Sequence, residues 1–482
     1  MTDLHYLPAT EALRRFRSHE LSPVELLDAV IARAEAVDTT VNALCHTFYD
    51  QAREQAREAE SRYMGKGEPA RPLEGIPTAV KEEEAVAGQP WTQGSLIYKD
   101  LVADQSSCFA QRILDSGAIV HARATAPEFS CAGFTHSRIH GITRNPWNPE
   151  FGVGGSSGGS GAALASGTAT LASGSDIGGS IRIPAAFNGV VGFKPPYGRV
   201  PQESPFNLDV YCHCGPMART VADTGLFQNV LAGPHPADHV SLRPKLELPE
   251  TFEGIDGMRI ALSVDLGDWP VDADVAANTL ATAEALREAG ALVDLVDLTV
   301  PQAVVLRAIA LHFNLIFAAW VADTAQQHSD QMTAYALEFA RWSDGVSAGG
   351  GMLEKLELEA EIWAPVSAVL ERYEALICPT SGTRGLVAGD DYVGHGLEVG
   401  GRDVEYYFDA IMTPVFNVLS RCPVLNVPSG IADNGVPTGI QIVGRTYDDV
   451  TPFRVGAALE QVRPWLDVDA RRPAIDVAAG SA

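Results

Sequence analysis

The sequence has too few basic residues for a protein that binds a polyanion. Its 35 Lys and Arg face 61 Asp and Glu, so the formal net charge is −26 over 482 residues. Nucleic acids and anionic membrane surfaces attract an excess of positive charge, which this sequence does not offer. We therefore expect neither a nucleic-acid partner nor a membrane partner.

A long apolar run is also missing. The most apolar stretch, 303–325, is interrupted by Arg307, His312 and Asn314, whereas a membrane-spanning helix needs about 20 predominantly apolar residues. The first residues lack the basic and apolar segments of a secretion signal. We expect no membrane span and no secretion signal, and we predict a buried helix over most of 303–325.

Cysteine is scarce and scattered. The seven cysteines are an odd number and lack the dense spacing of a disulfide scaffold, which favours a reducing, cytoplasmic location. His213 lies between Cys212 and Cys214, but a zinc site requires four ligands, and the sequence offers no second pair at a suitable spacing. We therefore expect no metal and no other cofactor.

The remaining composition and its patterning indicate an α/β fold. Hydrophobic residues make up 46% of the chain and charged residues 20%, which is ordinary for a globular protein. Residues 22–25 form a capping box with Pro23 at the first helical position, so we expect helix to about Arg62. Beyond residue 75, short apolar runs alternate with helical patterns. The predicted strands are 78–80, 118–121, 190–193, 258–263, 292–296, 376–378, 424–427 and 438–443, and the predicted helices are 108–116, 218–231, 273–289, 407–419 and 452–462.

One stretch, 151–180, has the composition of a functional loop. It contains ten glycines and seven serines in thirty residues, and Asp176 is its only charged residue. Glycine at this density permits close backbone approach and lets successive N–H groups converge on a negative charge. Four interpretations compete for it: a phosphate cradle, a dinucleotide-binding loop, a nucleophile elbow and a flexible linker.

Each of these interpretations has a feature against it. A phosphate-binding P-loop needs a lysine after its last glycine, and the dinucleotide fingerprint needs a third glycine where Ser157 stands. Residues 154–158 formally fit the G-x-S-x-G elbow, but two prolines precede them and no strand is predicted there. A Gly/Ser linker does not continue into the apolar residues that follow.

The same stretch closely resembles the signature of the amidase signature family. The resemblance is carried by residues 154–160 and 174–185, with twenty-four positions from Ser156 to Ser180, and it covers most of the chain. It implies an α/β fold with a single large mixed β-sheet core surrounded by helices. Residues 1–70 would be a helical segment packed on this core, and 71–482 the α/β domain, with a variable substrate-pocket region at about 300–375. Further similar segments are 75–81, 127–129, 143–147, 192–195, 215–223, 423–428 and 435–441.

The resemblance also implies a catalytic apparatus. It makes Ser180 the nucleophile, Ser156 the relay and Lys81 the base, with a cis peptide bond before Ser156. The residue types suit this chemistry, because a serine hydroxyl becomes a good nucleophile only when a neighbouring base takes its proton. The implied oxyanion hole consists of the backbone N–H groups of Ile177, Gly178, Gly179 and Ser180. We expect Asp176 and Arg182 to form a structural ion pair or loop brace, and Ser157 and Ser175 to be hydrogen-bond supports.

The sequence departs from the family pattern in three places. Glu82, Glu83 and Glu84 follow Lys81 where the family commonly has Asp-Asn. Strand alternation would put Glu83 on the side of Lys81, but we expect the chain to turn there and the acids to point to solvent. Residues 122–126 replace a polar family element, and Ile177 and Ile183 stand where glutamine-hydrolysing subunits more often have polar residues. These changes favour a less polar amide than glutamine.

The predicted function is serine-dependent hydrolysis of a small or aryl amide to an acid and an amine through an acyl-enzyme. Esters and carbamates (urethanes) pass through similar tetrahedral intermediates and stay open as substrates. The alternative is the glutamine-hydrolysing subunit of a tRNA-dependent amidotransferase, which would need sister subunits. A binding module, which would tolerate loss of Ser180, is the third class. The expected partner is a small-molecule amide, and the sequence leaves a homodimer open.

Overall fold

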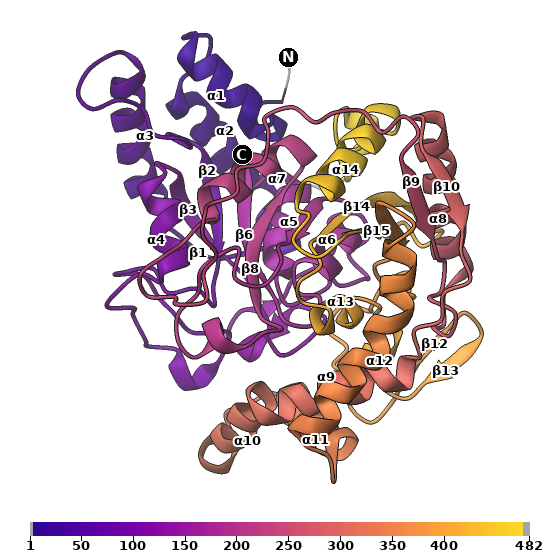
Figure 1. Cartoon of the computed structure of the whole chain (residues 1–482). Helices are drawn as coiled ribbons and strands as arrows, with labels where there is room; N and C mark the ends of the chain where they lie inside the picture. Colours follow the sequence, from indigo (N-terminus) through magenta and orange to yellow (C-terminus); the bar gives the residue numbers. More distant parts are fainter. Residues whose placement is uncertain (1–2, 476–482) are drawn as a thin grey trace.

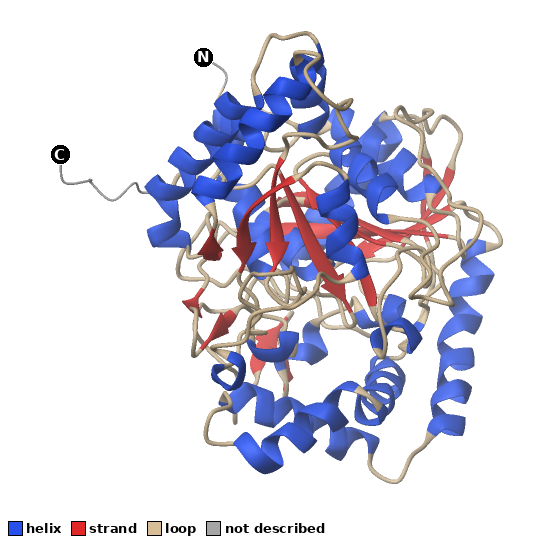
Figure 2. Ribbon diagram, turned by 90° about the vertical axis from the view of Figure 1, so that its left-hand side faces the viewer, coloured by secondary structure: helices blue, strands red, loops and turns tan. Residues whose placement is uncertain are grey.

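A mixed sheet of eleven strands forms the centre of the molecule in the computed structural model, which describes residues 3–475. The strand order is β1-β3-β2-β6-β8-β7-β14-β15-β11-β9-β10. Pairs β2–β3, β2–β6, β9–β10 and β9–β11 are parallel, and the others are antiparallel. Helices cover both sides of the strands (Figure 2). The expected α/β fold with one large mixed sheet surrounded by helices is confirmed.

The strands of the central sheet come from the whole length of the chain, and two short hairpins lie outside it. The hairpins are β4 (His136–Ser137) with β5 (Gly141–Ile142), and β12 (Leu397–Val399) with β13 (Arg402–Val404). The sheet contains β1 (Leu44–Thr47), β2 (Pro77–Lys81), β3 (Ile119–Ala124), β6 (Leu171–Asp176), β7 (Val191–Lys194), β8 (His213–Ala218), β9 (Arg259–Leu262), β10 (Leu292–Leu295), β11 (Ala375–Pro379), β14 (Val424–Ile431) and β15 (Pro437–Gly444).

The helices form separate groups around the sheet (Figure 1). The N-terminal helices α1 (Ala9–Arg17), α2 (Pro23–Val41) and α3 (Tyr49–Tyr63) lie beside the β1–β3 end. Helices α9 (Gln302–Leu315), α10 (Phe317–His328), α11 (Ala334–Ser347) and α12 (Met352–Leu370) pack on one another in the lower part of the view. The other helices are α4 (Cys108–Asp115), α5 (Gly158–Ser166), α6 (Arg182–Asn188), α7 (Val221–Leu231), α8 (Ala273–Glu288), α13 (Pro414–Val418) and α14 (Val450–Val462).

The predicted capping box at the start of α2 is present. The Ser22 side chain accepts a hydrogen bond from Val24 N at 3.0 Å, and the Glu25 carboxylate accepts one from Ser22 N at 2.8 Å. These bonds satisfy backbone donors that the first helical turn leaves open. The apolar face of α2, which includes Leu26, Leu27 and Val30, is buried.

All eight predicted strands fall on strands of the central sheet, and four predicted helices fall on α4, α7, α8 and α14. The other helix predictions need correction. The N-terminal part is not helical throughout to Arg62, because β1 separates α2 from α3, and 407–419 divide into a 3₁₀ turn and α13. The apolar run around 304–321 breaks at Ile316, whose φ of −132° and ψ of −78° are not helical, so that α9 and α10 are separate helices.

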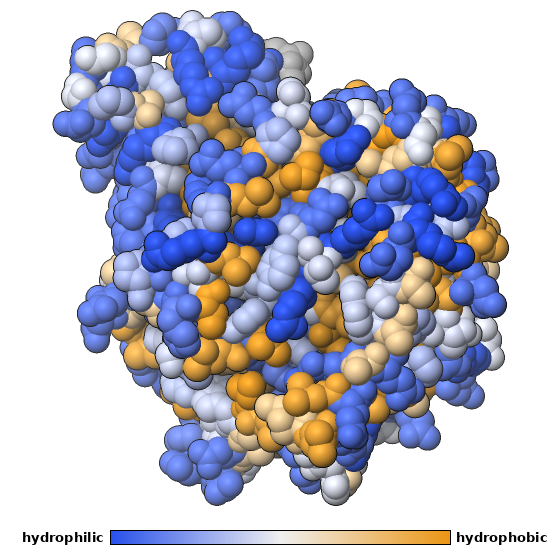
Figure 3. All heavy atoms as spheres, in the orientation of Figure 1, coloured by the Kyte–Doolittle hydropathy of each residue, from blue (hydrophilic) through white to orange (hydrophobic). Residues whose placement is uncertain are grey.

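Hydrophilic and hydrophobic residues are interspersed over the face of the molecule in Figure 3. Among the helices of residues 3–475, no single one is long and apolar enough to cross a membrane, and α9 and α10 meet the length and composition test only as a pair bent by 51°.

Candidate active site

Lys81 lies at the end of β2 with its side chain completely buried. Its Nζ donates hydrogen bonds to Ser156 Oγ at 2.6 Å and to Ser175 Oγ at 2.8 Å. Its backbone N–H donates to Ser173 Oγ at 2.9 Å, which fixes the end of β2 against β6. The fold therefore brings the predicted base and the predicted relay into direct contact, although they are separated by seventy-five positions.

The loop before α5 supplies Ser156 and Ser157. The Gly155–Ser156 peptide bond is cis, as the family resemblance implied. Ser157 N donates to Ser180 O at 3.1 Å, and the Ser157 hydroxyl accepts from Ser175 N at 3.3 Å. Ser157 thus joins this loop to the turn that contains Ser180. Among the described residues, no hydrogen bond links the Ser156 hydroxyl directly to that of Ser180.

The turn between β6 and α6 leaves a row of backbone donors open. Among residues 3–475, no hydrogen bond uses the backbone N–H of residues 177, 178, 179 or 180. Unpaired N–H groups in a protein interior are rare, and here three of the four residues (Ile177, Gly178 and Ser180) line a pocket. Such a row of donors is suited to bind a developing negative charge on an oxygen.

Gly179 and Thr413 fix the shape of this turn. Gly179 has a φ of +128°, a conformation that side-chain-bearing residues rarely adopt, and a Cβ there would lie 1.9 Å from Thr413 Oγ1. The same Thr413 hydroxyl donates to Gly178 O at 2.6 Å. Thr413 directly precedes α13, and its hydrogen bond holds the Gly178 carbonyl in place. The open N–H groups of Gly178 and Gly179 lie on either side of this carbonyl.

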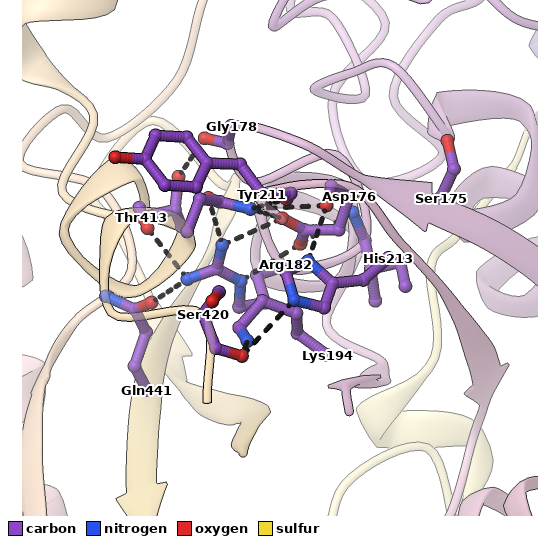
Figure 4. Close-up of polar contacts among 12 residues, drawn as sticks. Ser175, Asp176, Gly178, Arg182, Lys194, Tyr211, His213, Thr413, Ser420 and Gln441 are labelled. Atoms are coloured by element: carbon purple, nitrogen blue, oxygen red, sulfur yellow. Dashed lines mark hydrogen bonds and ion pairs between the residues drawn. The ribbon is translucent and has the colours of Figure 1, made fainter. Parts of the chain in front are cut away.

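Asp176 and Arg182 brace the turn from behind (Figure 4). Both side chains are completely buried, and Arg182 Nη2 lies 2.8 Å from Asp176 Oδ1. Arg182 Nη1 also donates to Thr413 O at 2.9 Å and to Gln441 Oε1 at 2.6 Å. Burial alone would raise the pKa of Asp176, but the Arg182 guanidinium and its hydrogen bonds hold that pKa well below its ordinary value. The pair connects β6 and α6 to the C-terminal part of the sheet.

The expectation that the three acids after Lys81 point to solvent is wrong. Glu82 is completely buried, and its carboxylate accepts hydrogen bonds from the backbone N–H groups of Thr92 and Gly94. Burial raises the pKa of Glu82, and burial with the nearby Glu83 raises that of Glu84. Glu83 Oε1 lies 3.1 Å from Lys81 Nζ, with its side chain 20% exposed. The chain turns after β2, as expected, but it folds the acids inward onto backbone donors and onto Lys81.

An aromatic pocket opens onto Ser180 and the open N–H groups. None of its lining residues is charged. The free space within it measures about 30 Å³, whereas an apolar cavity of about 150 Å³ holds benzene, so a group of that size would fit only if the lining rings shifted. The lining consists of residues 130–133, Gly155, Ile177, Gly178, Ser180, Ile183, Phe313, Phe317, Phe339, Trp342, Tyr406, Tyr407 and Phe408.

Sequence reasoning found part of this pocket. It singled out Ile177 and Ile183, and the pocket region expected at about 300–375 contains the lining residues from α9, α10 and α11, but the aromatic residues 406–408 were missed. The available signal in the sequence was the run of three consecutive aromatic residues at 406–408.

His213 has a structural position behind the site. Its two ring nitrogens lie 3.1 Å from Asp176 O and 3.3 Å from Ser420 O (Figure 4). Burial and the nearby Lys194 lower the pKa of His213 to about 3, so the ring is neutral. A neutral imidazole has one N–H group and can donate to only one of these two carbonyl oxygens, and the flanking Cys212 and Cys214 are free thiols.

Comparisons with known proteins agree with the fold and identify the family. A family model described as Amidase matches residues 25–452. The chain belongs to the amidase signature family and is an amidase, a hydrolase of amide C–N bonds. The crystal structure of a bacterial aryl acylamidase of that family superposes with a TM-score of 0.87 at 30% identity, over 98% of this chain and 99% of that one.

Two kinds of sequence relative match over nearly the full length. An acylamidase from Rhodococcus erythropolis is 32% identical over 96% of this chain and 97% of its own. One subunit of the glutamyl-tRNA(Gln) amidotransferase from Chloroflexus aurantiacus is 30% identical over 96% of this chain and 98% of its own. These identities are too similar to choose between the two substrates, so the choice depends on the pocket.

Proposed function

We propose that this amidase hydrolyses aryl or other hydrophobic amides through an acyl-enzyme on Ser180. The observation that carries the proposal is the uncharged aromatic pocket in contact with Ser180 and with the open backbone N–H groups beside it. Esters and carbamates of similar shape are further candidate substrates, because their reactions pass through the same kind of tetrahedral intermediate.

In the proposed mechanism, neutral Lys81 accepts a proton from Ser156 as Ser156 accepts one from Ser180. The Ser180 oxygen forms a bond to the amide carbonyl carbon, and the resulting oxyanion is stabilised by the N–H groups of residues 177–180. The relay then returns the proton to the amide nitrogen while the C–N bond breaks, because an amide anion is a very poor leaving group. Water, activated along the same path, hydrolyses the ester on Ser180 and regenerates the enzyme.

The contacts of Lys81 support its role as the base. Among the described residues, the only hydroxyls that form a hydrogen bond with Lys81 Nζ are those of Ser156, at 2.6 Å, and Ser175, at 2.8 Å. A hydroxyl can donate one hydrogen bond while accepting another, which makes Ser156 suitable to pass a proton in either direction. Ser175, whose neighbours are Lys81 and the Ser157 loop, is suited to hold the Lys81 amino group in place.

The pocket favours a hydrophobic amide over glutamine. Free glutamine carries an α-ammonium and an α-carboxylate, and burying a charge without a partner is strongly unfavourable. The lining offers no charged side chain to either group. Four of its aromatic residues, Phe313, Phe317, Phe339 and Trp342, come from 300–375, so we propose that this region determines which amide is accepted.

The test is amine release by the purified chain from aryl amides, aliphatic amides, glutamine and aryl carbamates. We expect turnover of aryl amides that is lost in Ser180→Ala and in Ser156→Ala. Ser166→Ala is the matched control, because its hydroxyl donates to Ala162 O within α5 and touches none of the catalytic groups. Turnover of glutamine alone would contradict the proposal and favour the amidotransferase function.

A further inference from the structure

A second group of chemically reactive side chains lies at the β1 edge of the sheet. Among residues 3–475, Cys45, His46 and His140 each offer a ligand atom, and these atoms lie within 4.8 Å of one another. The ring centroids of His46 and His140 are 5.4 Å apart, with the rings perpendicular. Strand β3 separates β1 from β2 and Lys81, so the group is distinct from the aromatic pocket.

An irregularity in β1 explains how neighbouring residues can share one centre. Successive side chains of a regular strand point to opposite faces. In the β1–β3 pair, however, the register shifts between Leu44 and His46: Leu44 pairs with Ala124, and His46 with Arg123. A bulge of this kind re-aims a side chain, which brings Cys45 and His46 to the same side of the strand.

The hydrogen bonds of the two imidazoles leave a ligand position open. His46 Nε2 is buried and has no hydrogen-bond partner among the described residues. A buried polar atom without a partner is unusual and calls for an explanation such as an ion. His140 Nε2 lies 3.0 Å from Thr92 Oγ1, an outer contact of the type that orients a metal-binding histidine.

We propose that Cys45, His46 and His140 bind one zinc ion. One thiolate and two imidazoles are ligands that Zn²⁺ prefers, whereas Mg²⁺ and Ca²⁺ prefer oxygen. Three protein ligands leave the fourth tetrahedral position to water. All three residues are half-buried.

The zinc site has a structural link to the segment after Lys81. Thr92, whose hydroxyl contacts His140, donates its backbone N–H to the buried Glu82 carboxylate. Zinc binding would therefore tie the β4–β5 turn and β1 to the loop that closes over the end of β2. Because binding to the folded state alone stabilises it, zinc is expected to raise the unfolding temperature.

The experiment titrates the chelator-treated, tag-free full chain with Co²⁺, followed by displacement with Zn²⁺. We expect one Co²⁺ per chain with the near-ultraviolet absorption of a thiolate–cobalt bond. Cys45→Ser should lose that absorption, His140→Ala should weaken binding at least tenfold, and Cys108→Ser is the matched cysteine control. Both histidine and cysteine variants are checked for folding by circular dichroism.

Either of two results would overturn the zinc site. One is the absence of stoichiometric Co²⁺ binding by the wild-type chain. The other is binding by Cys45→Ser and His140→Ala that equals the wild type, since the ion would then lie elsewhere. The readout is metal binding, so its outcome does not depend on amide hydrolysis.

Discussion

Replacing Asp176 with asparagine removes the charge that balances the buried Arg182 while nearly preserving the shape of the side chain. The two Asp176 oxygens accept hydrogen bonds from Arg182 Nε at 3.0 Å, Arg182 Nη2 at 2.8 Å, Asn417 Nδ2 at 2.8 Å and Ile181 N at 3.2 Å. An asparagine has one oxygen and one NH₂ group, so at least one of these donors would face another donor.

The size of the effect follows from the burial of the pair. Both side chains are 0% exposed, and breaking a buried ion pair by removing one partner costs about 3–5 kcal/mol, because the remaining charge is left unpaired. The folded-state pKa of Asp176 is lowered, so its contribution is complete above the unfolded pKa of about 4 and is lost as the pH falls through the lowered value. The loss in the variant should therefore be constant from about pH 5 to 8.

Urea unfolding followed by tryptophan fluorescence measures this effect. We expect a clearly lower urea midpoint for Asp176→Asn. Asp467→Asn breaks the exposed Asp467–Arg471 pair, whose side chains are 41% and 48% exposed, and it should change the free energy of unfolding by about 1 kcal/mol or less. Equal midpoints for Asp176→Asn and the wild type would refute the assignment of Asp176 as a brace.

Three further predictions concern the site itself. Gly179→Ala should lower kcat by about 100-fold or more, because it displaces the open N–H groups of residues 177–180. Gly401→Ala, also at positive φ but in open space, should keep the wild-type kcat, and equal kcat in both variants would contradict the role of Gly179 in shaping the turn. Glu83→Gln removes a carboxylate 3.1 Å from Lys81 Nζ, an interaction of about 1.3 kcal/mol even at the dielectric constant of water, so kcat/KM at a fixed pH should change by about tenfold. An unchanged kcat/KM would show that the contact has no electrostatic effect. Phe313→Ala should change the ratio of kcat/KM between aryl and small acyl amides by about tenfold or more, and an unchanged ratio would exclude this ring from substrate selection.

Strands with strong β-forming sequences were predictable, and weak ones were not. Residues 424–427 and 438–443 are rich in Val and Ile and were found. Strand β6 has no β-branched residue, and β8 contains Gly215 and Pro216. Both nevertheless lie in the middle of the sheet, where their burial and their pairing with each other outweigh local preference. The break between α9 and α10 at Ile316 was not predictable either, because no Gly or Pro lies there in the sequence.

The site was predictable where its residues are contiguous in sequence. The family resemblance carried by the Gly/Ser stretch implied the roles of Ser156 and Ser180, and the fold brings Ser156 to Lys81. Thr413 was not predictable, because it reaches the turn at residue 178 from 235 positions away. Strand alternation correctly placed Glu83 on the side of Lys81. The expectation that its carboxylate points to solvent was wrong, because the sequence gives no sign that the turn after β2 folds inward.

The central claim is that Ser180 carries the acyl group, and peptide mapping by mass spectrometry after rapid acid quench tests it most directly. The enzyme is mixed with an activated aryl ester or aryl carbamate, digested and compared with Ser180→Ala treated alike. The account predicts an acyl adduct on the peptide that contains Ser180 and none in the variant. An adduct on Ser156, or full turnover by Ser180→Ala without an adduct, would contradict it.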